Sequence, residues 1–303
     1  MTATATVSDV ASLPGELQRR LSRLNDARLR PRLDPALTLE AEMELRALEL
    51  SFLERERETV SAWAASAPDE PRAFLRWYEA LRENGPGQND PLFAWLANEA
   101  TMEQLAWFLA QEVAGEAGFD DLVALTQLKM PTRAKLELAR NYWDEMGRGK
   151  EGGMHGPMLD RIASELAVRE RGFDIVWEAV ALGNLLAGLA ANRRYAYHAI
   201  GALGVIELTA PGRAAQVDAA MQRLGVPAKT RQYYALHATL DIRHSAAWNA
   251  EVIAPLVAGE PRTARAMAEG ALMRLRAGER CFERYRQELI TGRARPSAPD
   301  PRR

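Results

Sequence analysis

Apolar residues recur at steps of three and four along most of the chain, which is the pattern of helices that bury one face. Alanine, leucine, glutamate and arginine, which favour helices, dominate nearly every segment. Alternating runs of valine, isoleucine and threonine, which would indicate strands, are scarce. The pattern predicts about ten helices. We therefore expect an all-α protein that is built as a helical bundle.

Several helix starts carry recognisable capping residues. Thr38 precedes an acidic first turn, as expected of an N-cap. Thr101 and Gln104 have the spacing of a capping box, in which each side chain bonds to the backbone of the other residue. Pro131 stands where proline is favoured, at the opening of a helix. These signals predict helices that begin at or just after these residues.

Glycine and proline mark the predicted breaks. Five glycines lie between residues 147 and 156 and interrupt the helical pattern. A longer helical stretch, residues 173–209, is expected to end at Pro211 and to kink at one of three glycines, Gly183, Gly201 or Gly204. Gly201 and Gly204 would also allow another helix to approach closely.

The same pattern divides the chain into three parts. We expect residues 1–89 to form an N-terminal helical extension packed on the bundle, and residues 90–292 to form the bundle itself. The last segment, residues 293–303, is rich in proline and arginine, and we expect it to be disordered.

Composition narrows the classes of function. Lysine and arginine number 39 and aspartate and glutamate 41, and this net charge of −2 argues against a nucleic acid as the main partner. No apolar run approaches the length of a membrane-spanning helix, and the first residues lack the features of a signal peptide. The single cysteine, Cys281, excludes a disulfide within the chain and any multi-cysteine metal site. We expect a cytoplasmic protein with no membrane partner.

Candidate chemistry begins with the placement of the histidines. His237, Asp241 and His244 follow one another at helical positions i, i+4 and i+7, so all three side chains lie on one face over two turns. Two imidazoles and a carboxylate in this arrangement can bind a transition metal. The alternative is an exposed polar face. Neighbouring Leu240 and Trp248 indicate a buried helix instead, in which unpartnered polar groups would be costly.

Three further residues are weaker candidates. Glu207 is a lone charge near the end of an apolar, glycine-containing helix. Glu145 follows Tyr142 and Trp143, and His155 lies ten residues later, across the glycine break. Taken singly, each has a simpler explanation as a solvated carboxylate or a hydrogen-bonding histidine.

Together these residues resemble a known pattern. The order Glu145, His155, Glu207 and then His237-x-x-x-Asp241-x-x-His244 is similar to that of the haem-oxygenase-like diiron oxidases, also described as iron-containing redox enzymes. The segments that begin at Asn141 and at Gly201 also look like signature stretches of that family. The resemblance covers roughly residues 90–290 and implies a haem-oxygenase-like bundle, in agreement with the helical pattern.

The resemblance also implies a cofactor and a reaction. It implies two Fe(II) ions bound by these six side chains, with one carboxylate bridging them. Some members add a carboxylate from an earlier helix, for which Glu112 and Glu116 are candidates, although both could be ordinary surface acids. The implied activity is the use of O2 for N-oxygenation, desaturation or C–C cleavage of a small amino-acid- or fatty-acid-like metabolite. We expect a coupling of metal binding to the ordering of residues 146–154, because glycines disfavour the helical state.

Other interpretations stay open at this point. The same architecture serves thiaminase-like hydrolases, which depend on a cysteine or an acid pair, and the chain could also be a metal-binding bundle without turnover. His198 matches no ligand position and is expected to be structural. The expected partners are a small-molecule substrate and O2, and the sequence leaves a homodimer open.

Overall fold

The computed structural model describes residues 14–31, 33, 38–116 and 118–291. Within them the chain forms thirteen α-helices and no strand longer than an isolated bridge. Their bounds are α1 Pro14–Leu29, α2 Leu39–Ala64, α3 Pro71–Asn84, α4 Pro91–Asn98, α5 Met102–Gly115, α6 Phe119–Thr126, α7 Thr132–Glu145, α8 His155–Glu165, α9 Trp177–Ala191, α10 Ala196–Arg223, α11 Gln232–Trp248, α12 Ala254–Gly259 and α13 Thr263–Arg286. The expectation of an all-α bundle is confirmed. The tail expected to be disordered, residues 293–303, lies outside the described residues.

The predicted capping residues take their roles. The Thr38 side chain accepts a hydrogen bond from the backbone of Ala41 and opens α2. Thr101 and Gln104 form the complete capping box at the start of α5. Pro131 precedes α7 directly. These contacts are local, so the sequence alone specifies them.

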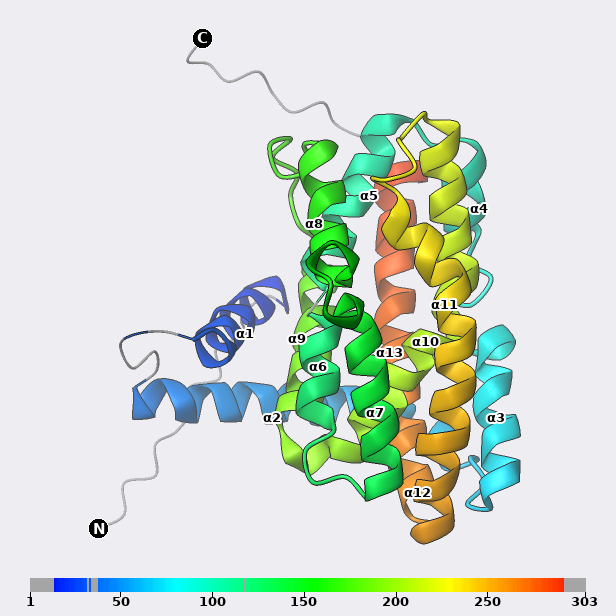
Figure 1. Ribbon diagram of the computed structural model, residues 1–303. Coiled ribbons are helices and arrows are strands. Elements are labelled where there is room, and N and C mark those ends of the chain that lie inside the picture. Colours follow the sequence, from blue (N-terminus) through cyan, green and yellow to red (C-terminus); the bar gives the residue numbers. More distant parts are fainter. Residues whose placement is uncertain (1–13, 32, 34–37, 117, 292–303) are drawn as a thin grey trace.

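Helix α10 lies at the centre of the bundle, between α11 and α13 (Figure 1). A Cβ atom on Gly201 of α10 would lie 1.9 Å from the carbonyl oxygen of Met267, and a Cβ on Gly270 of α13 would lie 1.9 Å from that of His198. The two helix backbones therefore touch, and a larger residue at either glycine would force them apart. The expected close approach at Gly201 is confirmed.

The long stretch of residues 173–209 differs from the prediction. Its break falls at residues 192–195 between α9 and α10, where the Asn192 side chain caps a short turn by accepting from the backbone of Arg194. None of the three glycines interrupts a helix. Pro211 does not end α10, which runs on to Arg223, because a proline removes one backbone donor and neighbouring helices hold the rest of the helix in place.

The N-terminal helices pack on the bundle. Helix α2 crosses the long helices near one end and packs on α13, while α1 packs on α9 (Figure 1). The buried side chain of Asn25 donates to Asn184 Oδ1 at 3.0 Å, and Tyr78 of α3 donates to the carbonyl of Gly201 at 2.7 Å. The division at residue 89 stays a prediction.

Candidate metal centre

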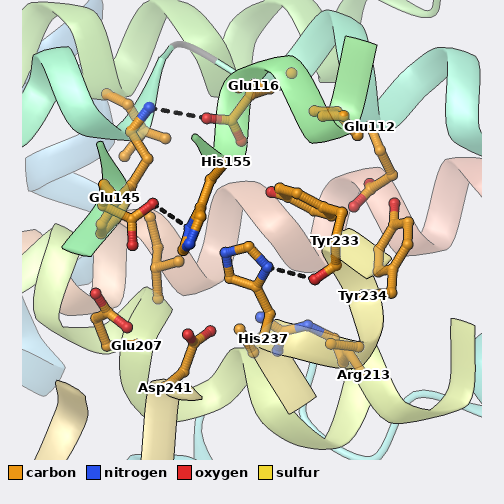
Figure 2. A pocket seen from close by; sticks show the side chains of 18 of the residues that line it. Glu112, Glu116, Glu145, His155, Glu207, Arg213, Tyr233, Tyr234, His237 and Asp241 are labelled. Carbon is orange, nitrogen blue, oxygen red and sulfur yellow. Dashed lines mark hydrogen bonds and ion pairs between the residues drawn. The ribbon is translucent and has the colours of Figure 1, made fainter. Parts of the chain in front are cut away.

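Four helices carry the six candidate side chains. Glu145 is the last residue of α7 and His155 is the first of α8, Glu207 lies in α10, and α11 supplies the rest. All are buried except His237, which is half-buried. Helices that are distant in the sequence thus bring the predicted set to one place. Figure 2 labels all of these side chains except His244.

The first ligand group consists of Glu145, His155 and His237. One potential ligand atom from each lies within 4.8 Å of the others. His155 Nδ1 lies 2.6 Å from Glu145 Oε2, yet this buried nitrogen has no hydrogen-bond partner of acceptable geometry. Donor atoms that converge without bonding to each other are arranged as the ligands of a cation would be.

The second group consists of Glu145, Glu207 and His244, with the same 4.8 Å limit. His244 Nδ1 lies 3.4 Å from Glu207 Oε2 and 3.9 Å from Glu145 Oε1, and it too is buried without a hydrogen-bond partner. Glu145 belongs to both groups and offers one oxygen to each histidine. The arrangement therefore has two adjacent groups of three candidate ligands that share one carboxylate.

Asp241 lies beside both groups without belonging to either. It lines the same cavity, and its Oδ1 is buried with no hydrogen-bond partner. Figure 2 shows its carboxyl group between Glu207 and His237. An unpartnered buried carboxylate oxygen at this place is a further candidate ligand.

Hydrogen bonds from outside the set fix the two histidines of α11. His237 Nδ1 lies 2.7 Å from the carbonyl oxygen of Tyr233, and since a carbonyl can only accept, Nδ1 carries the proton and Nε2 keeps its lone pair. His244 Nε2 lies 3.3 Å from Asp144 Oδ2, which by the same argument leaves Nδ1 of His244 free to bind a metal.

A further hydrogen bond holds Glu207. Asn141 Nδ2 donates to Glu207 Oε1 at 2.7 Å, and both residues are buried. Neither Asn141 nor Asp144 belongs to the set of ligands predicted from the sequence. Asn141 stands one helical turn before Glu145, on the same face of α7, so this spacing was the signal available.

Burial shifts the pKa values of two acids and two imidazoles of the site. Burial, with the charge of Glu207, raises the pKa of Asp241 to about 10 and that of Glu145 well above its ordinary value. Burial, with a neighbouring histidine, lowers the pKa of His155 and of His237 to about 4, so both imidazoles are neutral lone-pair donors.

His244 responds in the opposite sense. Burial alone would lower its pKa, but the combined attraction of Glu207, Glu145 and Asp144 outweighs burial and raises the pKa to about 9. A protonated His244 thus supplies some of the positive charge that stabilises the neighbouring carboxylates.

The segment between Glu145 and His155 forms a closed loop, which we call the clasp, residues 146–154. Its ends, Met146 and Met154, form an antiparallel bridge. Gly147 has φ +61°, and a Cβ there would lie 2.3 Å from the carbonyl carbon of Gly153. The indole of Trp143 lies against Gly149, and 52% of Trp143 is exposed. Whether metal binding orders the clasp stays a prediction.

A cavity of about 180 Å³ adjoins the site. Glu145, His155, Glu207, His237 and Asp241 line it together with apolar side chains. Glu112 and Glu116 are also on its wall, but neither belongs to a ligand group. Glu116 accepts from the backbone of Phe119 at 2.9 Å, which gives it a capping role at α6.

Two other reactive residues lie apart from the centre. His198 lies 3.1 Å from the buried carboxylate of Glu269, as a structural histidine would. Cys281 is buried, and its burial raises the pKa of the thiol to about 12, which opposes a nucleophilic role.

The residues present fit iron. Nitrogen and oxygen donors from histidine and carboxylate suit ferrous iron, and three of these donors, His155 Nδ1, His244 Nδ1 and Asp241 Oδ1, are buried without a hydrogen-bond partner.

Comparison with known proteins agrees with this fit. Residues 106–279 match a family described as iron-containing redox enzymes. Two crystal structures of a CADD-like protein of unknown function from Nostoc punctiforme resemble the fold. One has 19% identity and a TM-score of 0.56 and covers 71% of this chain and 96% of its own. The other has 18% identity and a TM-score of 0.50 and covers 80% and 96%. No curated protein matches the chain.

Proposed function

Since the chain belongs to the iron-containing redox enzyme family, we propose that it is a non-haem diiron oxidase or oxygenase that uses O2 to oxidise a small amino-acid- or fatty-acid-like metabolite. The family match spans more than half of the chain, and the coarser assignment to a redox family rests on it. The number of metal ions and the use of O2 are the parts that we propose.

One observation carries the proposal of two irons. Glu145 belongs to two ligand groups, with His155 and His237 on one side and with Glu207 and His244 on the other. A carboxylate has two oxygens, so it can bridge two metal ions while each histidine binds one of them. Asp241 would complete the set from α11.

The bound irons would supply the electrons that reduce O2. The chain's own groups hold the ligands and their protons in place. The Tyr233 carbonyl keeps the proton of His237 on Nδ1, Asp144 accepts from Nε2 of His244, and Asn141 holds Glu207 by one of its oxygens. The adjoining cavity gives a substrate a place beside the ligands.

Two alternatives are less well supported. A thiaminase-like hydrolase that uses a cysteine would need a reactive thiol, whereas Cys281 is buried and absent from the cavity wall. A metal-binding bundle without turnover would bind iron but would not consume O2 in a metal-dependent way.

Anaerobic titration with Fe(II), followed by exposure to O2, tests the proposal. We expect saturation at about two irons per chain, because there are two ligand groups, and uptake of O2 that requires the iron. Saturation at one iron would reduce the site to a mononuclear centre, and iron binding without O2 uptake would favour the non-catalytic alternative.

A further inference from the structure

Two arginines line the cavity beside the ligand groups. Arg213 comes from α10 and Arg274 from α13, and both are half-buried. Arg274 makes no hydrogen bond or ion pair with any described residue, and its Nε is buried without a partner. Such a guanidinium is costly unless an anion accompanies it, because arginine stays charged at neutral pH.

Arg213 also lacks an ion-pair partner among the described residues. Its hydrogen bonds go to neutral groups, at 3.4 Å to Gln88 Oε1 and at 3.1 Å to Thr209 Oγ1. Its guanidinium lies over the rings of Phe93 and Phe282, 6.0 Å and 5.6 Å from their centroids. These contacts position the side chain but do not pair its charge with a carboxylate.

The two charges repel each other and share one nearby acid. Burial and the charge of Arg274 lower the pKa of Arg213 to about 10. Both arginines attract Glu112, but no oxygen of Glu112 lies within ion-pair distance, and burial raises the pKa of Glu112 to about 7. Arg274 also attracts Glu116, which is exposed and already bonded to Phe119. Asp120 also lines the cavity, yet no described carboxylate on its wall lies within ion-pair distance of either guanidinium.

Arg213 and the acids of the ligand groups lie in different parts of the cavity. Glu145, Glu207 and Asp241 lie on one side of the view in Figure 2, whereas Glu112, Tyr234 and Arg213 lie on the other. Arg213 follows Glu207 by six residues, or about 9 Å along the axis of α10. Leu182, Leu186 and Ile206 are among the apolar residues that line the cavity.

We propose that Arg213 and Arg274 bind the carboxylate of an apolar monocarboxylic acid, whose chain extends through the cavity toward Glu145 and Asp241. The volume of about 180 Å³ limits this ligand to a small molecule. The anchoring of the carboxylate is independent of the metal. Oxidation at the far end of the ligand's apolar chain rests on the proposed function.

Calorimetric titration with octanoate, 1-octanol and octylamine tests the anchor, since these probes share a chain and differ in the head group. The protein is used both metal-free and loaded anaerobically with Fe(II). We expect octanoate to bind more tightly than the alcohol, and the amine to bind least. Arg274→Gln and Arg213→Gln should each weaken octanoate binding by about tenfold or more and leave 1-octanol unchanged. Arg274→Lys, which keeps the charge, should retain part of the preference.

Arg276→Gln is the matched control, because Arg276 is an exposed residue of the same helix that pairs with Glu279. It should bind octanoate as the unaltered protein does. Three results would each overturn the anchor. They are equal affinity for octanoate and 1-octanol, no binding of octanoate, and an undiminished preference for octanoate over 1-octanol in both Gln variants. Two bound irons with no acid preference would refute the anchor alone. An arginine-dependent acid preference in a protein that binds no iron would refute the diiron proposal alone.

Discussion

At the scale of single residues, Glu145 has the most demanding position. It ends α7, it is 3% exposed, and each of its oxygens lies near a different histidine. The sequence could indicate that Glu145 is a candidate ligand but not that it is shared, because sharing depends on where α8, α10 and α11 meet it.

Single-ligand variants should therefore separate the two iron sites. His155→Ala and His244→Ala each remove a ligand from one group, so each variant should saturate near one Fe(II) per chain. Glu145→Ala removes a ligand from both groups and should weaken both sites. Arg243→Ala alters the exposed residue next to His244 and should still bind two. Anaerobic titration measures each value, and a His244→Ala variant that binds two irons at unchanged affinity would remove His244 from the set.

The thiol of Cys281 gives a second test at this scale. Its side chain is buried and burial raises its pKa to about 12, so the reactive thiolate is scarce at pH 8. Iodoacetamide should leave the native protein unlabelled and should label one thiol per chain after denaturation. Rapid labelling of the native protein would restore the cysteine-dependent hydrolase as a serious alternative.

At the scale of elements, the clasp sets the distance between Glu145 and His155. Gly147 has a left-handed backbone conformation that costs other residues about 1–2 kcal/mol. A Cβ there would also collide with Gly153. Gly147→Ala should therefore displace His155 and reduce iron binding toward one per chain. Gly152→Ala is the control within the clasp, since a Cβ on Gly152 meets no atom within 4 Å. Equal iron binding by the two variants would show that the clasp does not position His155.

Elements that depend on local contacts were predictable from the sequence, whereas elements that depend on packing between helices were not. The starts of α2 and α5 were predictable because capping contacts lie within a few residues. The passage of α10 through Pro211 was not, since it depends on helices that pack around it. The stripe of His237, Asp241 and His244 was likewise local. Arg213 and Arg274 lie far apart in the sequence, and no short-range pattern indicates that they share a cavity.

At the scale of the whole molecule, the contact between α10 and α13 holds the bundle together. Because a Cβ on Gly201 would lie 1.9 Å from a backbone oxygen, Gly201→Ala should destabilise the fold by at least about 2 kcal/mol. Gly212→Ala lies in the same helix with open space around it and should be neutral or stabilising by up to about 1 kcal/mol. Urea unfolding followed by circular dichroism measures both. A Gly201→Ala protein as stable as the unaltered chain would mean that α10 and α13 can separate at little cost.

Within the described residues, no helix has both the length and the apolar character needed to cross a bilayer. A cytoplasmic location and a homodimer stay predictions.

The packing of Trp143 against Gly149 makes the clasp observable by fluorescence. An indole that is half exposed changes its emission when the surface beside it moves, and this one rests on the loop that joins Glu145 to His155. If binding of a closed-shell ion such as Zn²⁺ fixes the clasp, the emission of Trp143 should shift with metal concentration. The chain has seven tryptophans, and the emission lost in Trp143→Phe would identify the part that comes from Trp143. The protein thus carries its own optical reporter of whether the segment between two proposed ligands is open or closed.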